Sequence, residues 1–219
     1  MRFGRIDYLN LLPFHVFMKR YLRSSQAQMM LRYGANVPSQ INRDYRSGKV
    51  DAAFISSIRA KREKHVGLGI IADGAVQSVL LFPSDSSLPD TASETSNVLA
   101  EILGLQGQVL IGDPALRAYL AGAQAFDLAL EWKRRTGLPF VFAVLSTRRK
   151  NSAMKRLARI FKRQPVKIPR YLLERAALRS GSPPAAILAY LRPINYQMDH
   201  RSWRGLHRFW RLAKNKKQL

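Results

Sequence analysis

Short apolar segments alternate with amphipathic segments along most of this 219-residue chain. Brief apolar runs between turn-forming residues are typical of buried strands, whereas apolar residues spaced three and four apart are typical of helices. The strand-like segments are RIDYL, AAFIS, GLGIIADGAVQSVLLF, QVLIGD and FVFAVLS. The helix-like segments are Leu12–Leu22, Ser39–Gly48, Ser96–Leu103, Phe126–Arg135 and several after Asn151. This alternation predicts an α/β protein with a mainly parallel sheet that is covered on both faces.

Two segments are predicted to cross between lobes. PSDSSLPDTASETS is rich in Ser, Pro and Asp, and it follows a long strand-like run that ends at Phe82. A second crossing is predicted at GLPFVFAVLSTRR, after which the chain is helical and basic. Two crossings make the middle piece an insertion, so we expect lobe I to comprise residues 1–83 and 147–219, and lobe II to comprise residues 84–146.

The opening segment GRIDYLNLLPF predicts a strand, a turn and a helix. Arg5 to Leu9 is strand-like, Asn10 tolerates a tight backbone, and Pro13 suits the first turn of a helix. Ligands of open α/β sheets bind at such turns beyond the carboxyl ends of strands. Asn10 therefore either caps the helix that begins near Leu12 or faces a ligand, and residue type alone leaves both alternatives open.

Other polar residues also stand where strands end or helices begin. Ser56 and Ser57 follow the apolar run AAFI, Ser93–Ser96 opens a helix, and Asp113 follows QVLIG. Hydroxyl groups beside the N–H groups of a helix N-terminus can hold a carboxylate. Each is also explained singly as a cap or a turn residue. Their coincidence with Asn10 in two lobes predicts a cleft for a small acidic molecule.

The charge of the chain is strongly positive. It has 37 Lys and Arg against 14 Asp and Glu, which gives a net charge of +23, and most of the excess follows Thr147. Such a field attracts nucleic acid, anionic lipid or a small polyanion. In SAMKRLARIFKRQ the apolar stripe of Met154, Leu157, Ile160 and Phe161 indicates a packed helix with a basic outer face. No nucleic-acid-binding motif accompanies these basic residues, so we expect a small-molecule partner and no specific binding of nucleic acid.

Several classes of chemistry are disfavoured by composition. The chain has no cysteine, which excludes disulfides and thiolate nucleophiles. Its four histidines, His15, His65, His200 and His207, lack paired metal-ligand spacing, and we expect them on the surface or in packing. There is no signal-peptide pattern and no apolar run long enough to span a bilayer. The expectation is a cytoplasmic protein without a membrane span, of undetermined oligomeric state.

The order of several longer motifs resembles that of the MqnA family. These motifs are GRIDYLNLLPF, VPSQINRDYRSGKVDAAFISS, GLGIIADGAVQSVLLFP, SETS, VLIGDPALRAY, FDLALEWKRRTGLPFVFAVLS and the tail AAILAYLRPINYQMDHRSWRGLHRFWRLA. The resemblance covers almost the whole chain. It implies a type 2 periplasmic-binding-protein-like fold of two α/β lobes with a ligand cleft between them. It also implies a chorismate dehydratase of the futalosine route to menaquinone, which forms 3-[(1-carboxyvinyl)oxy]benzoate without a metal or an organic cofactor.

The resemblance also implies roles for residues of the predicted cleft. Asn10 would lie closest to the chemistry, where it positions the departing hydroxyl or stabilises developing charge. Four hydroxyl residues would hold the carboxylates of chorismate, namely Ser56, Ser57, Thr95 and Ser96. The cleft would also be lined by Tyr8 and Asp113.

Two departures from the family pattern concern lobe II. Only NVLAEILGLQGQ separates SETS from the next strand, where the family often has a longer segment, so lobe II should be trimmed. Glu94 is an acid beside a predicted carboxylate site, and we expect it to face solvent near the helix N-terminus.

Two alternatives compete with this function. The sister MqnD family, 1,4-dihydroxy-6-naphthoate synthase, opens with a Pro-Asn-Asp-Thr motif and has a histidine where this chain has Gly112; both marks are missing. A solute-binding protein for a small carboxylate shares the fold, but an exported one should carry a signal or a lipidated cysteine.

Overall fold

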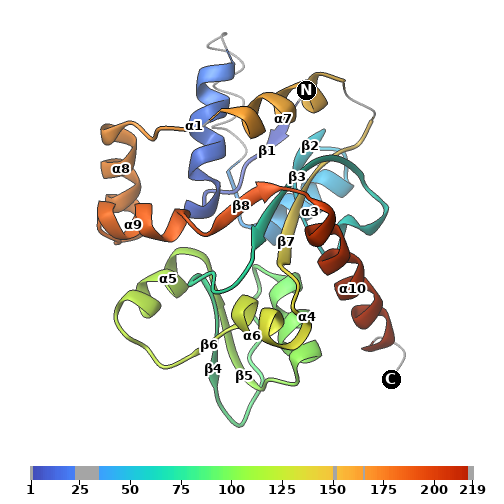
Figure 1. The fold of residues 1–219 in the computed structure, drawn as a ribbon, viewed down its shortest axis with the longest axis vertical. Helices are drawn as coiled ribbons and strands as arrows, with labels where there is room; N and C mark the ends of the chain where they lie inside the picture. Colours follow the sequence, from blue (N-terminus) through green and yellow to red (C-terminus); the bar gives the residue numbers. More distant parts are fainter. Residues whose placement is uncertain (1, 23–34, 150–151, 165, 217–219) are drawn as a thin grey trace.

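Two β-sheets divide the part of the chain that the structure describes. The computed structural model describes residues 2–22, 35–149, 152–164 and 166–216. Within them, one sheet has the strand order β1-β2-β7-β3-β8 and the other has the order β5-β4-β6. The strands are β1 (Phe3–Gly4), β2 (Ala52–Ser56), β3 (Lys64–Ala72), β4 (Val79–Pro83), β5 (Gly107–Ile111), β6 (Phe126–Asp127), β7 (Phe140–Thr147) and β8 (Ile194–Gln197). Figure 1 shows the five-stranded sheet in lobe I, above the three-stranded sheet of lobe II.

The sheets place the first crossing before the predicted segment and the second at the start of the predicted segment GLPFVFAVLSTRR. The chain leaves lobe I at residues 73–78, between β3 and β4, and returns at residues 137–139, between α6 and β7. The predicted limits at 83/84 and 146/147 therefore assigned β4 and most of β7 to the wrong lobes. The single apolar run GLGIIADGAVQSVLLF is two strands of different sheets. The Ser/Pro-rich segment lies inside lobe II, between β4 and α4.

The expectation of a mainly parallel sheet was wrong. Among the strands of the described ranges, only β1 and β2 pair in parallel, whereas β7 is antiparallel to both β2 and β3, and β8 is antiparallel to β3. In lobe II, β4 is antiparallel to both of its neighbours. The reason lies in the insertion: β3 leads toward lobe II and β7 leads back, so the two neighbouring strands must run in opposite directions.

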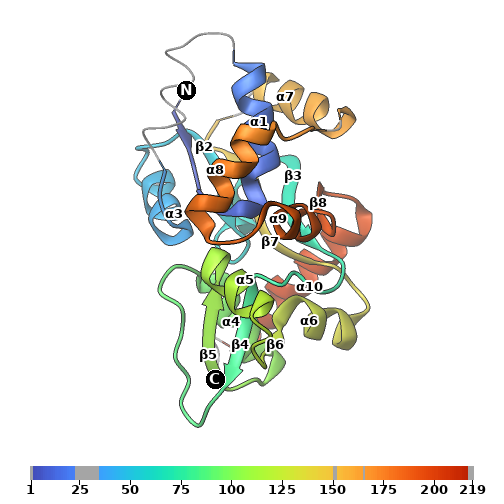
Figure 2. The same cartoon turned by 90° about the vertical axis from the view of Figure 1, so that its left-hand side faces the viewer.

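Helices cover the two sheets. They are α1 (Leu12–Tyr21), α3 (Pro38–Arg46), α4 (Glu94–Leu103), α5 (Gly112–Leu120), α6 (Leu128–Thr136), α7 (Ser152–Arg163), α8 (Arg170–Ser180), α9 (Pro184–Leu191) and α10 (His200–Lys216), with the short 3₁₀ helices η1 (Leu9–Leu11) and η2 (Ala60–Arg62). Both views place α5 beneath α8 and α9 (Figures 1 and 2). Helix α10 packs on β7 of lobe I and on α4 of lobe II, so it contacts both lobes.

The patterns predicted helices better than short strands. Helix α7 buries Met154, Leu157 and Phe161 and exposes its basic face, as predicted. Helix α5 and strands β6 and β8 were missed. The strand predicted over RIDYL was wrong, because β1 ends at Gly4 and Arg5 makes only an isolated bridge to Ala35. Strands of two to four residues carry too few alternations to be recognised.

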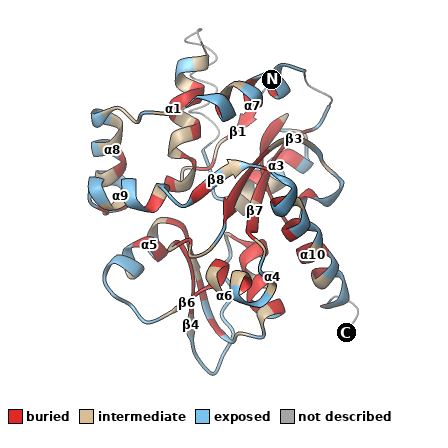
Figure 3. Cartoon of the chain, viewed as in Figure 1, coloured by how far each residue is buried: buried red, intermediate tan, exposed pale blue. Residues whose placement is uncertain are grey.

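Burial is concentrated where strands and helices meet. Figure 3 shows buried residues along the central strands and exposed residues on the outer faces of α7, α8 and α10. In lobe I, Phe14 stacks edge-on against both Phe54 and Phe161, at ring distances of 5.0 and 5.2 Å. Among the described residues, no helix is long and apolar enough to cross a membrane.

Candidate active site

The segment after β1 carries Asn10 to a contact between the lobes. Asn10 lies inside η1, which packs against α5 of lobe II. Helix α1 has Leu11 at its N-cap position, and no side chain accepts a capping hydrogen bond there. The structure therefore excludes the alternative in which Asn10 caps the helix.

The side-chain oxygen of Asn10 is buried without a partner. Asn10 Oδ1 accepts no hydrogen bond from the described residues, while the backbone oxygen of Asn10 accepts one from the Tyr196 hydroxyl at 2.5 Å. A buried polar atom without a hydrogen bond costs about 1–3 kcal/mol of stability. A hydrogen-bond donor of a ligand would remove this penalty.

Asp113 joins lobe II to the same segment. It lies in the first turn of α5, and its Oδ1 accepts a hydrogen bond from the backbone N–H of Leu9 at 3.2 Å. Burial raises the pKa of Asp113, and the Leu9 N–H and the guanidinium groups of Arg179 and Arg117 oppose this increase. The contact fixes η1 against lobe II.

Tyr8 packs against the start of α5. A Cβ atom on Gly112 would lie 2.8 Å from Tyr8 Cε1, and Gly112 has a φ of +70°, so a side chain there would collide with the ring. Burial, assisted by Asp90 and Asp113, raises the pKa of Tyr8 to about 12. The Tyr8 phenol therefore keeps its proton at neutral pH and remains a hydrogen-bond donor.

Ser56 is held by a residue that the sequence patterns did not single out. Asn42 Nδ2 on α3 donates to Ser56 Oγ at 2.8 Å, and Ser56 N donates to Asn42 Oδ1 at 3.1 Å. The Ser56 hydroxyl thus acts as an acceptor toward Asn42 and keeps its own proton for another acceptor. Asn42 fixes the orientation of this hydroxyl.

Ser57 has a different environment. It is fully buried, and its hydroxyl donates to the backbone oxygen of Val141 at 2.5 Å. Its own backbone oxygen accepts a hydrogen bond from Trp210 Nε1 at 2.7 Å. The Ser57 hydroxyl proton is therefore engaged within lobe I, which makes this residue a support for the end of β2.

The hydroxyl residues of α4 meet the end of β2 from lobe II. Thr95 Oγ1 accepts a hydrogen bond from the backbone N–H of Ile58 at 3.2 Å and keeps its own proton. Ser96 Oγ lies 2.8 Å from Ser93 Oγ, and Ser93 caps α4 by accepting from Ser96 N at 3.2 Å. Both Thr95 and Ser96 are buried.

The sequence predicted that Glu94 faces solvent, but in the structure Glu94 also forms an ion pair with a residue of lobe I. It lies in the first turn of α4, where its Oε2 is 2.5 Å from Arg59 Nε of lobe I. Both side chains are partly exposed, so this ion pair contributes little to stability. It links the lobes beside Thr95 and leaves less negative charge at the start of α4.

The predicted site residues form two groups, each at a contact between the lobes. The first group is Tyr8, Asn10 and Asp113, and the second is Ser56, Ser57, Thr95 and Ser96. Direct hydrogen bonds join the lobes at both contacts. The sequence missed Asn42 and Tyr196, because the first is one polar residue among many on α3 and the second lies on the unrecognised strand β8.

A buried carboxylate, that of Asp127, binds the segment of residues 73–78 by which the chain leaves lobe I. Asp127 Oδ2 accepts from the backbone N–H groups of Val76 and Gln77 at 2.8 and 2.6 Å, and Asp127 Oδ1 caps α6. Gln77 is the described non-glycine residue with a left-handed backbone, at a φ of 63°. Such a backbone costs about 1–3 kcal/mol, which the Asp127 hydrogen bonds help to offset.

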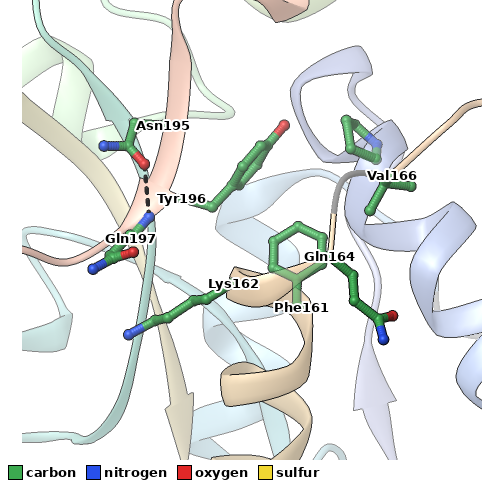
Figure 4. A pocket seen from close by; sticks show the side chains of 8 residues that line it. Phe161, Lys162, Gln164, Val166, Asn195, Tyr196 and Gln197 are labelled. Atoms are coloured by element: carbon green, nitrogen blue, oxygen red, sulfur yellow. Dashed lines mark hydrogen bonds between the residues drawn. The ribbon is translucent and has the colours of Figure 1, made fainter.

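The cavities that the described residues of lobe I enclose include a smaller and a larger one. The smaller has a volume of about 230 Å³, and Figure 4 shows Tyr196, Phe161 and Lys162 in its wall. The larger, of about 460 Å³, lies between α1 and α8 and reaches Tyr8.

The histidines have no grouping that suits a metal. In the described ranges, no cluster of three or more His, Cys, Asp and Glu residues could hold a metal ion. His65 and His207 lie among Trp203 and Trp210, which is the packing role predicted for them. His200 is exposed, whereas His15 lines the larger cavity.

A protein-family model described as menaquinone biosynthesis matches residues 1–106 and 100–215. The chain belongs to this family. The two matched pieces meet at residues 100–106, where the sequence predicted a shortened lobe II.

Two relatives are named chorismate dehydratase. The protein from Campylobacter jejuni is 38% identical over 218 residues, which cover 98% of each chain. The protein from Thermus thermophilus is 28% identical over 264 aligned positions, which cover 94% of this chain and 92% of the relative. That alignment is longer than this chain, so the Thermus protein has insertions relative to it.

Solved structures show the same fold at low sequence identity. A protein from Archaeoglobus fulgidus matches with a TM-score of 0.71 at 12% identity and covers 100% of this chain and 98% of its own. The alkanesulfonate-binding protein from Xanthomonas axonopodis pv. citri, bound to MOPS, matches with a TM-score of 0.56 at 16% identity and covers 100% and 94%. The fold is therefore periplasmic-binding-protein-like, with two α/β lobes.

Proposed function

We propose that this protein is a chorismate dehydratase of menaquinone biosynthesis. The observation that carries the proposal is the 38% identity to the Campylobacter jejuni chorismate dehydratase across 98% of both chains. The two-lobed fold and the polar residues at the lobe contacts support it, because two closing lobes can orient a small substrate and exclude water.

The proposed reaction is a hydro-lyase elimination. The ring C–H bond beside the enolpyruvyl ether breaks, its electron pair forms a ring C=C bond, and the ring C–OH bond breaks. The proton and the hydroxide leave as water, and the aromatic product is 3-[(1-carboxyvinyl)oxy]benzoate. Because aromatisation drives the elimination, the enzyme must chiefly orient the substrate and supply hydrogen-bond donors.

The roles of the site residues belong to this proposal. Asn10 positions the departing hydroxyl, which can donate to the buried amide oxygen that has no described partner, or its amide N–H groups stabilise the developing charge. Ser56 and Thr95 bind the substrate carboxylates, since each keeps a hydroxyl proton free. Ser96 belongs to the same carboxylate site, Ser57 supports it through the end of β2, and Tyr8 and Asp113 line the cleft beside Asn10. The cytoplasmic location and the single small-molecule partner remain predictions of the sequence.

The test is turnover of chorismate by the purified protein. We expect a product whose absorbance is that of a substituted benzoate and whose mass is lower than that of chorismate by one water. A solute-binding protein would bind chorismate without converting it. The fold that this chain shares with the alkanesulfonate-binding protein makes solute binding the alternative that the assay must distinguish. Saturable binding of unchanged chorismate would therefore overturn the proposal.

A further inference from the structure

The wall of the larger cavity of lobe I holds four cations. Arg5 lies on the segment before η1, Lys19 on α1, and Arg175 and Arg179 on α8, while Asp7 is the carboxylate in the cavity wall. Its volume of about 460 Å³ falls within the range of about 300–1,000 Å³ that is common for small-molecule sites. The cavity lies along α1, whereas the candidate active site lies where the lobes meet, and Tyr8 borders both.

The positive charge of this cavity is not balanced by its own carboxylate. Asp7 Oδ1 lies 2.5 Å from Arg5 Nη2 and 3.7 Å from Arg179 Nη1, so one carboxylate serves two guanidinium groups. Arg179 also lies 3.7 Å from Asp113 Oδ2. Arg175 forms no ion pair within the described ranges. A positive field therefore remains for an anionic ligand.

Two buried nitrogen atoms in the wall also lack partners. Arg5 Nε and His15 Nε2 are shielded from solvent and make no hydrogen bond with the described residues. Arg5 Nε is a donor, and a ligand oxygen would satisfy it. Burial, with the charges of Arg5 and Arg179, lowers the pKa of His15 to about 3, so this imidazole stays neutral beside the cations. Uncharged wall is supplied by Leu12, Val16 and Ala176.

We propose that the cavity between α1 and α8 binds a small organic molecule with two acidic groups. Two anionic groups match the excess of four cations over one carboxylate in the wall, and the apolar wall suits a carbon skeleton between them. The inference stands on the cavity alone and does not rest on the proposed reaction. The ligand is either the substrate or a different organic acid, and competition between ligands distinguishes these sources.

The experiment measures binding of isophthalate, a stable aromatic dicarboxylate, by isothermal titration calorimetry. The test variant is Arg175→Gln, and the matched control is Arg170→Gln, an exposed position on the same helix that pairs with Glu174 outside the cavity. Both changes remove one positive charge. We expect saturable binding by the wild type and by Arg170→Gln, and binding weaker by about tenfold or more for Arg175→Gln, as for loss of a charge-assisted hydrogen bond.

A second variant tests the location independently of charge. Ala176→Leu adds volume to the cavity wall and should also weaken isophthalate binding, with melting temperatures measured to confirm folding. Absence of saturable binding to the wild type, or equal affinity in all four proteins, would overturn the proposal. Displacement of isophthalate by chorismate would identify the substrate as the ligand, and lack of displacement would identify another acid; both support a dianion site. Chorismate turnover, assayed separately, reports on the proposed reaction.

Discussion

Replacing Asn10 by alanine should lower chorismate turnover without lowering the stability of the fold. The change removes an amide from the buried segment η1, where Asn10 Oδ1 has no hydrogen-bond partner among the described residues. If the amide stabilises the transition state, its loss costs about 2.7–4 kcal/mol, which is roughly a hundredfold to a thousandfold in rate. Asn10→Asp should be similarly impaired, because it places a carboxylate beside a dianionic substrate and removes the amide donor.

The stability of the same variant provides the sharper measurement. A buried acceptor without a partner costs about 1–3 kcal/mol, and Asn10→Ala removes this penalty together with some packing. We expect the free energy of unfolding to stay unchanged or to rise by up to about 2 kcal/mol. For a chain of this length the melting temperature would rise by about 2–4 °C per kcal/mol.

Turnover and thermal midpoint should be measured together for Asn10→Ala, Asn10→Asp and Asn215→Ala. Asn215 is an exposed asparagine on α10, so its replacement should change neither quantity. A helix cap would behave in the opposite way: Asn10→Ala would lose about 1 kcal/mol of stability, and Asn10→Asp would keep both stability and turnover. Near-normal turnover in the aspartate variant would refute the role of Asn10 in the chemistry.

Three further outcomes are expected. Asn42→Ala and Ser56→Ala should each raise KM for chorismate, with a smaller effect on kcat. The double variant should have a KM little higher than either single variant, because Asn42 acts through Ser56. Additive effects of the two changes would contradict this. The pKa of His15 is lowered from 6.5 to about 3, so between these pH values the imidazole binds a proton in the unfolded chain but not in the folded chain. The free energy of unfolding should therefore fall by about 3 kcal/mol between about pH 7 and pH 4. Urea unfolding of His15→Gln should show a smaller acid loss than the exposed His200→Gln, and equal losses would refute the assignment. Finally, the charge of +23 should make kcat/KM fall with added salt where substrate capture is limiting, and a salt-independent kcat/KM would assign the charge to surface solvation alone.

The sequence located the candidate site better than it explained each residue. Strand ends and helix starts can be read from local patterns, and these placed Ser56, Thr95 and Asp113 at positions that the structure brings to the lobe contacts. The hydrogen-bonding state of each hydroxyl depends on residues distant in sequence. Ser57 is satisfied by Val141, which lies 84 positions away, and local reasoning could not separate it from Ser56.

The sequence by itself determined the α/β class, most helices, the basic outer face of α7 and the existence of two crossings, because these depend on periodicity and composition along short segments. Only the tertiary structure decided where the crossings occur. Residues 73–78 interrupt one apolar run, and its two halves belong to different sheets since β3 pairs with β7 while β4 pairs with β5. Long-range contacts, which no local pattern records, likewise decide the strand directions, the hydrogen bond that joins the lobes through Leu9 and Asp113, and the cationic cavity between α1 and α8.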